Sequence, residues 1–166
     1  VHNKFSALNM LVDNEPKQEL LGAVTQSRGL QGRYVEAVVD SGAVHPVASH
    51  PTFAGPISPS PWSTAGRSYR AANGTKIANL GQSWVAFGTN EGHTCEIPFQ
   101  IADADQPLLS VTHLTSCGNK VELDANEGRI TNHKTGRTIR LERRGGVYLL
   151  RMWVADAPLP FHRQGA

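Results

Sequence analysis

The sequence predicts an all-β fold with one short helix, and three observations carry this prediction. The chain has 166 residues, which is long enough for one domain but too short for two, and 39% of its residues are hydrophobic, which suits a domain with its own core. It contains 16 Gly and 10 Pro, which interrupt helices and delimit short extended segments. Apolar stretches of strand length recur between turn signals.

Three segments are predicted from the pattern of apolar residues. Residues 1–30 form an N-terminal arm, because they are polar and lack sustained periodicity. Residues 31–154 form the folded domain, and residues 155–166 form a tail without a core pattern. The chain begins with Val1 rather than Met, so we expect a processed product or a fragment whose targeting segment has already been removed.

The first predicted strand covers residues 33–39. Its side chains alternate, with Val35, Ala37 and Val39 on one face, as a half-buried strand requires. This strand leads directly into Asp40. Residues 45–66 hold five of the ten prolines and predict a long irregular connection.

Six further stretches predict short strands, which we expect to form an antiparallel meander. Turn signals such as those at residues 89–92 and 144–146 separate them. The strands are expected at residues 83–87, 95–101, 120–123, 128–131, 138–141 and 147–154.

One helix is predicted from residue 107 to about residue 117. Pro stands in its first turn, and Gly118 follows its last residue. Leu108, Val111 and Leu114 are spaced three residues apart, so they share one face of a helix. We expect that apolar face to dock on the sheet.

The most informative stretch reads Val-Val-Asp-Ser-Gly-Ala at residues 38–43. Two β-branched residues that run into Asp40, Ser and Gly are typical of the loop of an aspartic peptidase half-site. Such an enzyme needs two carboxylates that share one proton, because like charges so close cannot both ionise. No other acidic residue of the chain is followed by Ser/Thr-Gly, so a second subunit is expected to supply the partner, most simply in a homodimer. Asp-Ser-Gly is also ordinary turn chemistry at the end of a strand, and that interpretation stays open.

Two more stretches follow the half-site in order: Tyr-Arg-Ala-Ala-Asn-Gly-Thr-Lys-Ile at residues 69–77 and Pro-Leu-Leu-Ser-Val-Thr-His-Leu at residues 107–114. With them the chain resembles the retropepsin-like aspartic protease domain of copia-type retroelement polyproteins, most closely those of algal protists. The resemblance covers roughly residues 33–154. It implies a retropepsin-like (acid protease) closed barrel with one short helix and extended N- and C-terminal arms.

The resemblance also implies site residues and partners. The catalytic loop would comprise Asp40, Ser41 and Gly42, and the tip of a substrate-covering flap would comprise Ala72, Asn73 and Gly74. Ser41 would hydrogen-bond across a homodimer, and the substrate would be an extended peptide. No cofactor and no metal are implied. Gly74 after Asn73 permits the positive φ of a tight hairpin turn, which a plain hairpin needs equally. Viral relatives carry a glycine-bearing motif where this chain has Leu109, Ser110 and Val111, and copia-type members share the serine.

Other classes of protein receive little support from the sequence. The net charge is +2, and the basic stretch at residues 134–144 alternates with apolar residues as in a solvated hairpin, so nucleic-acid binding is not expected. Cys95 and Cys117 lack metal-ligand spacing and are expected to be reduced thiols. His45 and His50 are no ligand signature either. No apolar stretch approaches 18 residues, so no membrane span is expected.

A second hypothesis belongs to another class. The same fold can be retained as a non-catalytic subunit of a large protein assembly that holds both arms, with Asp40 idle, because a fold does not determine a function. The first hypothesis places the chain in the cytoplasm and the second places it in an organelle, and the sequence does not choose between these compartments.

Overall fold

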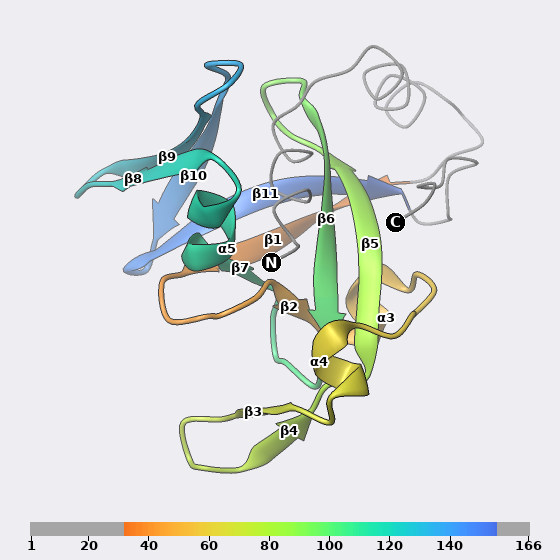
Figure 1. The fold of residues 1–166 in the computed structure, drawn as a ribbon. Coiled ribbons are helices and arrows are strands. Elements are labelled where there is room, and N and C mark those ends of the chain that lie inside the picture. The colour runs from red at the N-terminus through yellow and green to blue at the C-terminus, as the bar shows by residue number, and fades with distance from the viewer. Residues whose placement is uncertain (1–31, 156–166) are drawn as a thin grey trace.

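The computed structural model describes residues 32–155, and its elements are strands connected by short helices. The predicted all-β class is confirmed (Figure 1). The predicted N-terminal arm and nearly all of the predicted tail lie outside the described residues. The strands are β1 (Gly32–Asp40), β2 (Val47–Ala48), β3 (Ser68–Arg70), β4 (Lys76–Ala78), β5 (Gly81–Gly88), β6 (Thr94–Ile101), β7 (Leu108–Ser110), β8 (Asn119–Leu123), β9 (Glu127–Asn132), β10 (Thr138–Arg144) and β11 (Val147–Ala155). The helices are α3 (His50–Phe53), α4 (Pro61–Thr64) and α5 (Val111–Ser116).

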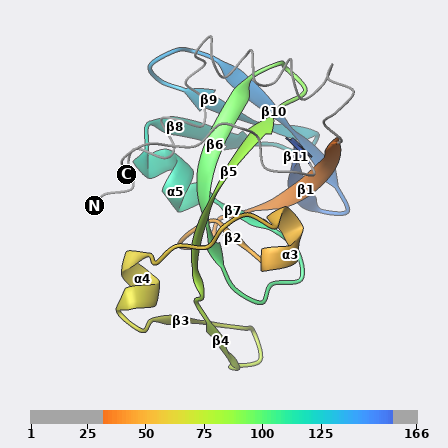
Figure 2. The same cartoon turned by 90° about the vertical axis from the view of Figure 1, so that its right-hand side faces the viewer.

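Nine strands form one sheet in the order β1-β7-β2-β6-β5-β11-β10-β9-β8, and β1 also pairs with β11. Strands β3 and β4 form a separate two-stranded hairpin. Figures 1 and 2 show this hairpin beyond one end of β5 and β6, apart from the large sheet. The hairpin is therefore connected to the sheet mainly at its base.

Strand β1 ends at Asp40 and pairs with two other strands. It pairs antiparallel with β11 from Gly32 opposite Ala155 to Val38 opposite Leu149. Its last residues also pair in parallel with β7, where Asp40 lies opposite Ser110. Its first five residues are partly or fully exposed, but the three residues before Asp40 are all buried, because neighbours cover the strand on both faces there.

Each of the seven predicted strands lies within an observed strand. The predicted antiparallel meander is only partly correct. Strands β8, β9, β10 and β11 do pair antiparallel in sequence order, but β1 with β7 and β2 with β6 are parallel pairs. Residues 45–66 also contain β2, α3 and α4 rather than an irregular connection alone. Parallel pairs join segments far apart in the chain, so local patterns do not reveal them.

The helix predicted from residue 107 begins later than expected. Strand β7 occupies the first part of that segment, and α5 begins only at Val111. The Val38 amide donates to the carbonyl oxygen of Pro107 at 2.9 Å, which ties this segment to β1. Pairing with β1 buries Leu109 completely, whereas the predicted helix would have pointed Leu108 into the core. Tertiary pairing therefore overrides the local helical spacing.

The assignment of residues 108–110 to strand β7 can be tested by comparing substitutions of two leucines. Leu109→Ala should lower the free energy of unfolding by about 2 to 5 kcal/mol, because it opens a cavity in the core. Leu108→Ala should cost distinctly less, since Leu108 is only half-buried and faces the cleft described below. Denaturant titration of both variants measures the difference. The reverse ranking would support a helix from residue 107 instead of β7.

Candidate functional site

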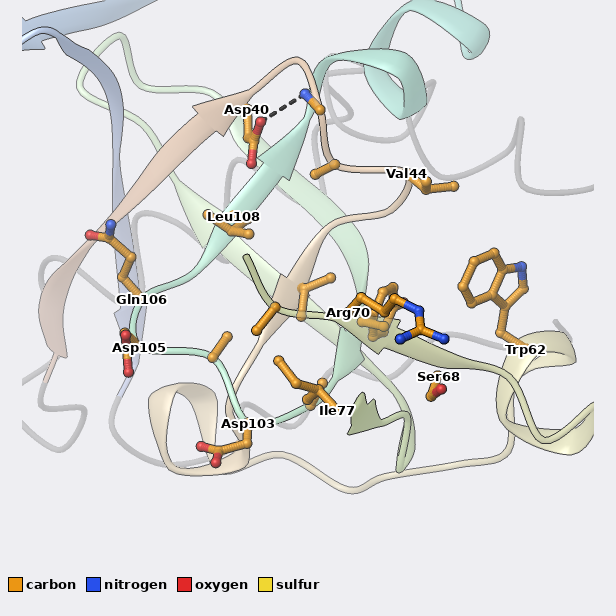
Figure 3. A pocket seen from close by; sticks show the side chains of 17 residues that line it. Asp40, Val44, Trp62, Ser68, Arg70, Ile77, Asp103, Asp105, Gln106 and Leu108 are labelled. Carbon is orange, nitrogen blue, oxygen red and sulfur yellow. Dashed lines mark hydrogen bonds between the residues drawn. The ribbon is translucent and has the colours of Figure 1, made fainter. Parts of the chain in front are cut away.

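The carboxylate of Asp40 lies at the end of β1, immediately after the buried Val39. Its Oδ1 accepts a hydrogen bond from the backbone N–H of Gly42 at 2.7 Å (Figure 3). Among the described residues, Oδ2 has no hydrogen-bond partner. A Cβ atom at Gly42 would lie 3.3 Å from Oδ1, closer than an ordinary van der Waals contact, so glycine leaves room for the carboxylate. One oxygen is thus fixed while the other is available.

The side chain of Ser110 hydrogen-bonds to the loop that follows Asp40. Its side chain is completely buried. Its Oγ donates to the carbonyl oxygen of Ala43 at 2.6 Å and accepts from the backbone N–H of His113 at 3.0 Å. One hydroxyl therefore holds the loop after Asp40 and also caps the N-terminus of α5. Sequence reasoning noted this serine as a departure from viral relatives but placed it inside a helix.

The predicted flap tip is a tight turn between β3 and β4. Gly74 has φ of 86°, and its N–H donates to the carbonyl oxygen of Ala71 at 2.9 Å. The side-chain oxygen of Asn73 accepts from the N–H of Thr75 at 2.9 Å. The expected hairpin turn is therefore present at Ala72, Asn73 and Gly74. These three residues do not line the cleft of the single chain, whereas the strand that precedes them does.

A cleft of about 610 Å³ separates the Asp40 loop from the β3–β4 hairpin, a volume in the usual range of ligand sites. Its third side is the segment from residue 102 to residue 108, as Figure 3 shows. The cleft is lined by apolar side chains from all three sides, Val44, Val47, Ile77 and Leu108. It is also lined by four charged side chains, Asp40, Arg70, Asp103 and Asp105.

One end of the cleft carries an aromatic group that sequence reasoning missed. Trp62 of α4 and Tyr69 of β3 both line the cleft, and their rings stack with centroids 5.4 Å apart. His45, from the loop after Asp40, meets Trp62 edge-on at 4.5 Å. Tyr69 was part of the family motif and Trp62 stood in the Pro-rich connection, but no local signal indicates that these rings meet.

Burial shifts the ionisation of groups behind this end of the cleft. Burial raises the pKa of the Tyr69 phenol, so its hydroxyl remains protonated. Burial also lowers the pKa of His45. The pKa of His113 falls to about 4, mainly because the ring is buried and further because of repulsion from His45. Both imidazoles are therefore neutral near pH 7.

The remaining predicted features have structural roles or stand exposed. Ser41 is exposed, and its hydroxyl has no hydrogen-bond partner within residues 32–155. Two arginines of the basic stretch pair with carboxylates: Arg140 lies 2.6 Å from Glu127 and Arg144 lies 2.7 Å from Glu36. Cys95 and Cys117 are buried and not joined by a disulfide.

No cluster of three or more His, Cys, Asp or Glu residues between residues 32 and 155 is arranged to hold a metal ion. Among the same residues, no helix has the length and apolarity that crossing a membrane requires.

Comparisons with known proteins leave the site to be interpreted from its own geometry. No family model, no curated protein and no solved structure matches this chain.

Replacing Ser110 tests whether its hydroxyl organises the site. Ser110→Ala should lower the free energy of unfolding by about 1 to 3 kcal/mol, because the Ala43 carbonyl and the His113 N–H both lose a buried partner. The exposed Ser116 lies on the same helix, and Ser116→Ala should change stability by less than about 0.5 kcal/mol. Denaturant titration distinguishes them, and equal effects would contradict the role given to Ser110.

The buried imidazole of His113 predicts a loss of stability in acid. The folded pKa of about 4 lies below the ordinary value of 6.5, so the unfolded chain takes up the proton first. This contribution is complete above pH 6.5 and declines as the pH falls toward 4, by roughly 3 kcal/mol in total. Unfolding titrations across this range should show the decline in the native chain.

The matched variants identify the source of that decline. In His113→Leu the decline in unfolding free energy that comes from protonation of His113 should be absent, even if the substitution changes the unfolding free energy at pH 7. His133 is exposed, so His133→Gln should retain the full decline. A His113→Leu curve parallel to that of the native chain would show that another group is responsible.

Proposed function

We propose that this chain is one subunit of a homodimeric aspartic endopeptidase of the retropepsin type, related to the protease domains of copia-type retroelements. The observation that carries the proposal is the Asp40 carboxylate, which borders a peptide-sized cleft with one oxygen held by Gly42 and the other unbound within the described chain. The three parts that such a half-site needs, an acid loop, a hairpin and a cleft between them, adjoin one another.

The strand pairings support the fold part of this proposal. Six strands follow one another as β1-β7-β2-β6-β5-β11, and β11 pairs again with β1. Such a cycle of pairings is what a closed barrel requires, since closure leaves no free edge among its members. The β5–β11 link in the cycle is short, consisting of Trp153 opposite Gly88.

The stoichiometry of carboxylates supports the dimer. Asp103 and Asp105 also line the cleft, but both are exposed and belong to another loop. Within the described chain, neither accepts a hydrogen bond from a glycine amide as Asp40 does from Gly42. A two-fold axis beside the Asp40 loop would bring two copies of Asp40 together and double the cleft. Ser41 and Val44, both exposed on this loop, would then lie near the partner.

In the proposed reaction the two Asp40 carboxyl groups share one proton. The ionised carboxylate takes a proton from water, and the water oxygen bonds to the carbon of the scissile peptide bond. The protonated carboxyl donates its proton to the carbonyl oxygen as the tetrahedral intermediate forms. The C–N bond then breaks while a proton passes to the departing nitrogen, which leaves a new carboxyl group and a new amine.

The substrate is an extended peptide in this proposal. The β3–β4 hairpin pairs only with itself within the described chain, so its edges can hydrogen-bond to a peptide backbone. The apolar cleft walls would receive alternate side chains. The hairpin tip extends past the cleft of one chain, where the cleft of a second chain would continue.

The decisive substitution is Asp40→Asn, which keeps the size of the side chain and removes its charge. Cleavage of an unstructured protein substrate at about pH 5 to 6 should fall by a factor of about 10² to 10⁴ or more. Asp105→Asn removes an equal charge from the same cleft and should leave most of the activity. Unaltered cleavage by Asp40→Asn would refute the proposal.

A mixing experiment tests the dimeric dyad itself. When wild-type chains exchange with a roughly ninefold excess of Asp40→Asn chains, activity per wild-type chain should fall about tenfold, because most wild-type chains pair with the variant. Sedimentation should show a dimer under the same conditions. A monomer that cleaves no peptide would instead favour the non-catalytic structural subunit as the function of this fold.

A further inference from the structure

The base of the β3–β4 hairpin is attached to the Asp40 loop by three aromatic rings. The loop contributes His45, α4 contributes Trp62 and β3 contributes Tyr69. His45 meets Trp62 at 4.5 Å with an interplanar angle of 88°, and Trp62 stacks on Tyr69 at 5.4 Å with an angle of 23°. Such edge-on and stacked pairs attract each other beyond the area they bury. The rings therefore link the loop, the helix and the hairpin directly.

A chain of hydrogen bonds runs through the same contact. The side-chain amide of Asn79, just after β4, donates to the Tyr69 phenol oxygen at 3.5 Å. This leaves the Tyr69 hydroxyl to donate to Nδ1 of His45, 3.3 Å away. The neutral His45 imidazole, whose pKa burial lowers, can accept that proton. Both strands of the hairpin are thus fastened at their base.

The fastening is anchored in the large sheet. The buried Gln100 of β6 accepts from Asn79 at 2.9 Å and from the Ser60 hydroxyl at 2.7 Å. Ser60 in turn caps α4, which carries Trp62. The guanidinium of Arg67 covers the Trp62 ring at 5.3 Å. The rings are therefore anchored in the large sheet, whereas β3 and β4 pair only with each other among the described strands.

We propose that His45, Trp62 and Tyr69 form a clamp that fixes the distance between the β3–β4 hairpin and Asp40 across the cleft. They are positioning residues and not catalytic ones, because they act through the hairpin. This inference rests on the proposed peptidase function, in which the hairpin must close over the substrate. A loosened clamp lets the hairpin leave the closed position more often, so the binding-competent state is less populated and apparent affinity falls by the same fraction.

Two variants interrupt the clamp, one at a residue outside the cleft walls and one by removing a single hydroxyl group. His45 is not among the residues that line the cleft, and His45→Leu removes its hydrogen bond and its edge contact. Tyr69→Phe removes only the hydroxyl and keeps the stacked ring. We expect KM to rise by about fivefold to tenfold in His45→Leu and less in Tyr69→Phe, with kcat changed by no more than about twofold.

Conservative and neighbouring substitutions provide the controls. His45→Gln retains a hydrogen-bond acceptor and should recover part of the loss in KM. Thr64→Ala alters an exposed residue of α4 that does not line the cleft, so KM should stay within about twofold of the native value. A role in stability alone would lower the unfolding free energy of His45→Leu and leave KM unchanged.

Hydrogen exchange tests the clamp independently of catalysis. Without substrate, the backbone amides of residues 68–78 should exchange at least about fivefold faster in His45→Leu than in the native chain, whereas those of β1 and β11 should be unaffected. Faster exchange together with cleavage that survives Asp40→Asn would retain the clamp and refute the peptidase. Unchanged exchange in both His45→Leu and Tyr69→Phe would refute the clamp, whatever the activity.

Discussion

The parallel pairing of β1 with β7 places Asp40 opposite Ser110, and most of the site depends on this register. Near Asp40, β1 pairs with β11 on one edge and with β7 on the other, so the end of the strand that carries the carboxylate is held on both sides. The register also brings the Ser110 hydroxyl beneath the loop, where one buried oxygen both receives and donates a hydrogen bond. A polar group with two partners in a dry interior allows few alternative positions. The loop geometry therefore follows from the sheet.

In the proposed homodimer, the site of one chain is half of a symmetric arrangement. One carboxylate, one hairpin and one cleft adjoin each other, but the hairpin tip at Ala72, Asn73 and Gly74 extends past the cleft that its own chain forms. A second chain related by a two-fold axis would supply a second carboxylate and a second cleft next to the hairpin tip. One two-fold axis would therefore account both for the single Asp40 of each chain and for the hairpin tip that extends past its own cleft.

Two histidines connect stability with this geometry. His113 lies under the loop on α5, and His45 lies on the loop itself; each is buried enough for the neutral form to be favoured. An aspartic dyad works best where one of its carboxyl groups is still protonated, which favours acid, whereas His113 favours the folded chain at higher pH. In the proposed enzyme these opposing requirements would set the acidic limit of the working range.

Local sequence patterns predicted the all-β class, the places of seven strands, the turn at Gly74 and the position of Asp40 at a strand end. Each of these depends on local chemistry: alternation of apolar residues, the conformational freedom of glycine, and turn residues after a β-branched pair. The same local rules failed at residues 107–110, where helical spacing of Leu108, Val111 and Leu114 gave way to a strand.

Contacts between distant segments became evident only in the folded chain. The parallel pairs β1–β7 and β2–β6, the contact of Ser110 with the Asp40 loop, and the meeting of His45, Trp62 and Tyr69 all join segments separated by long stretches of chain. No local pattern encodes such a contact, because its free energy comes from burying both partners together. For this reason six residues were enough to predict that Asp40 ends a strand, whereas the surroundings that position it could not be predicted.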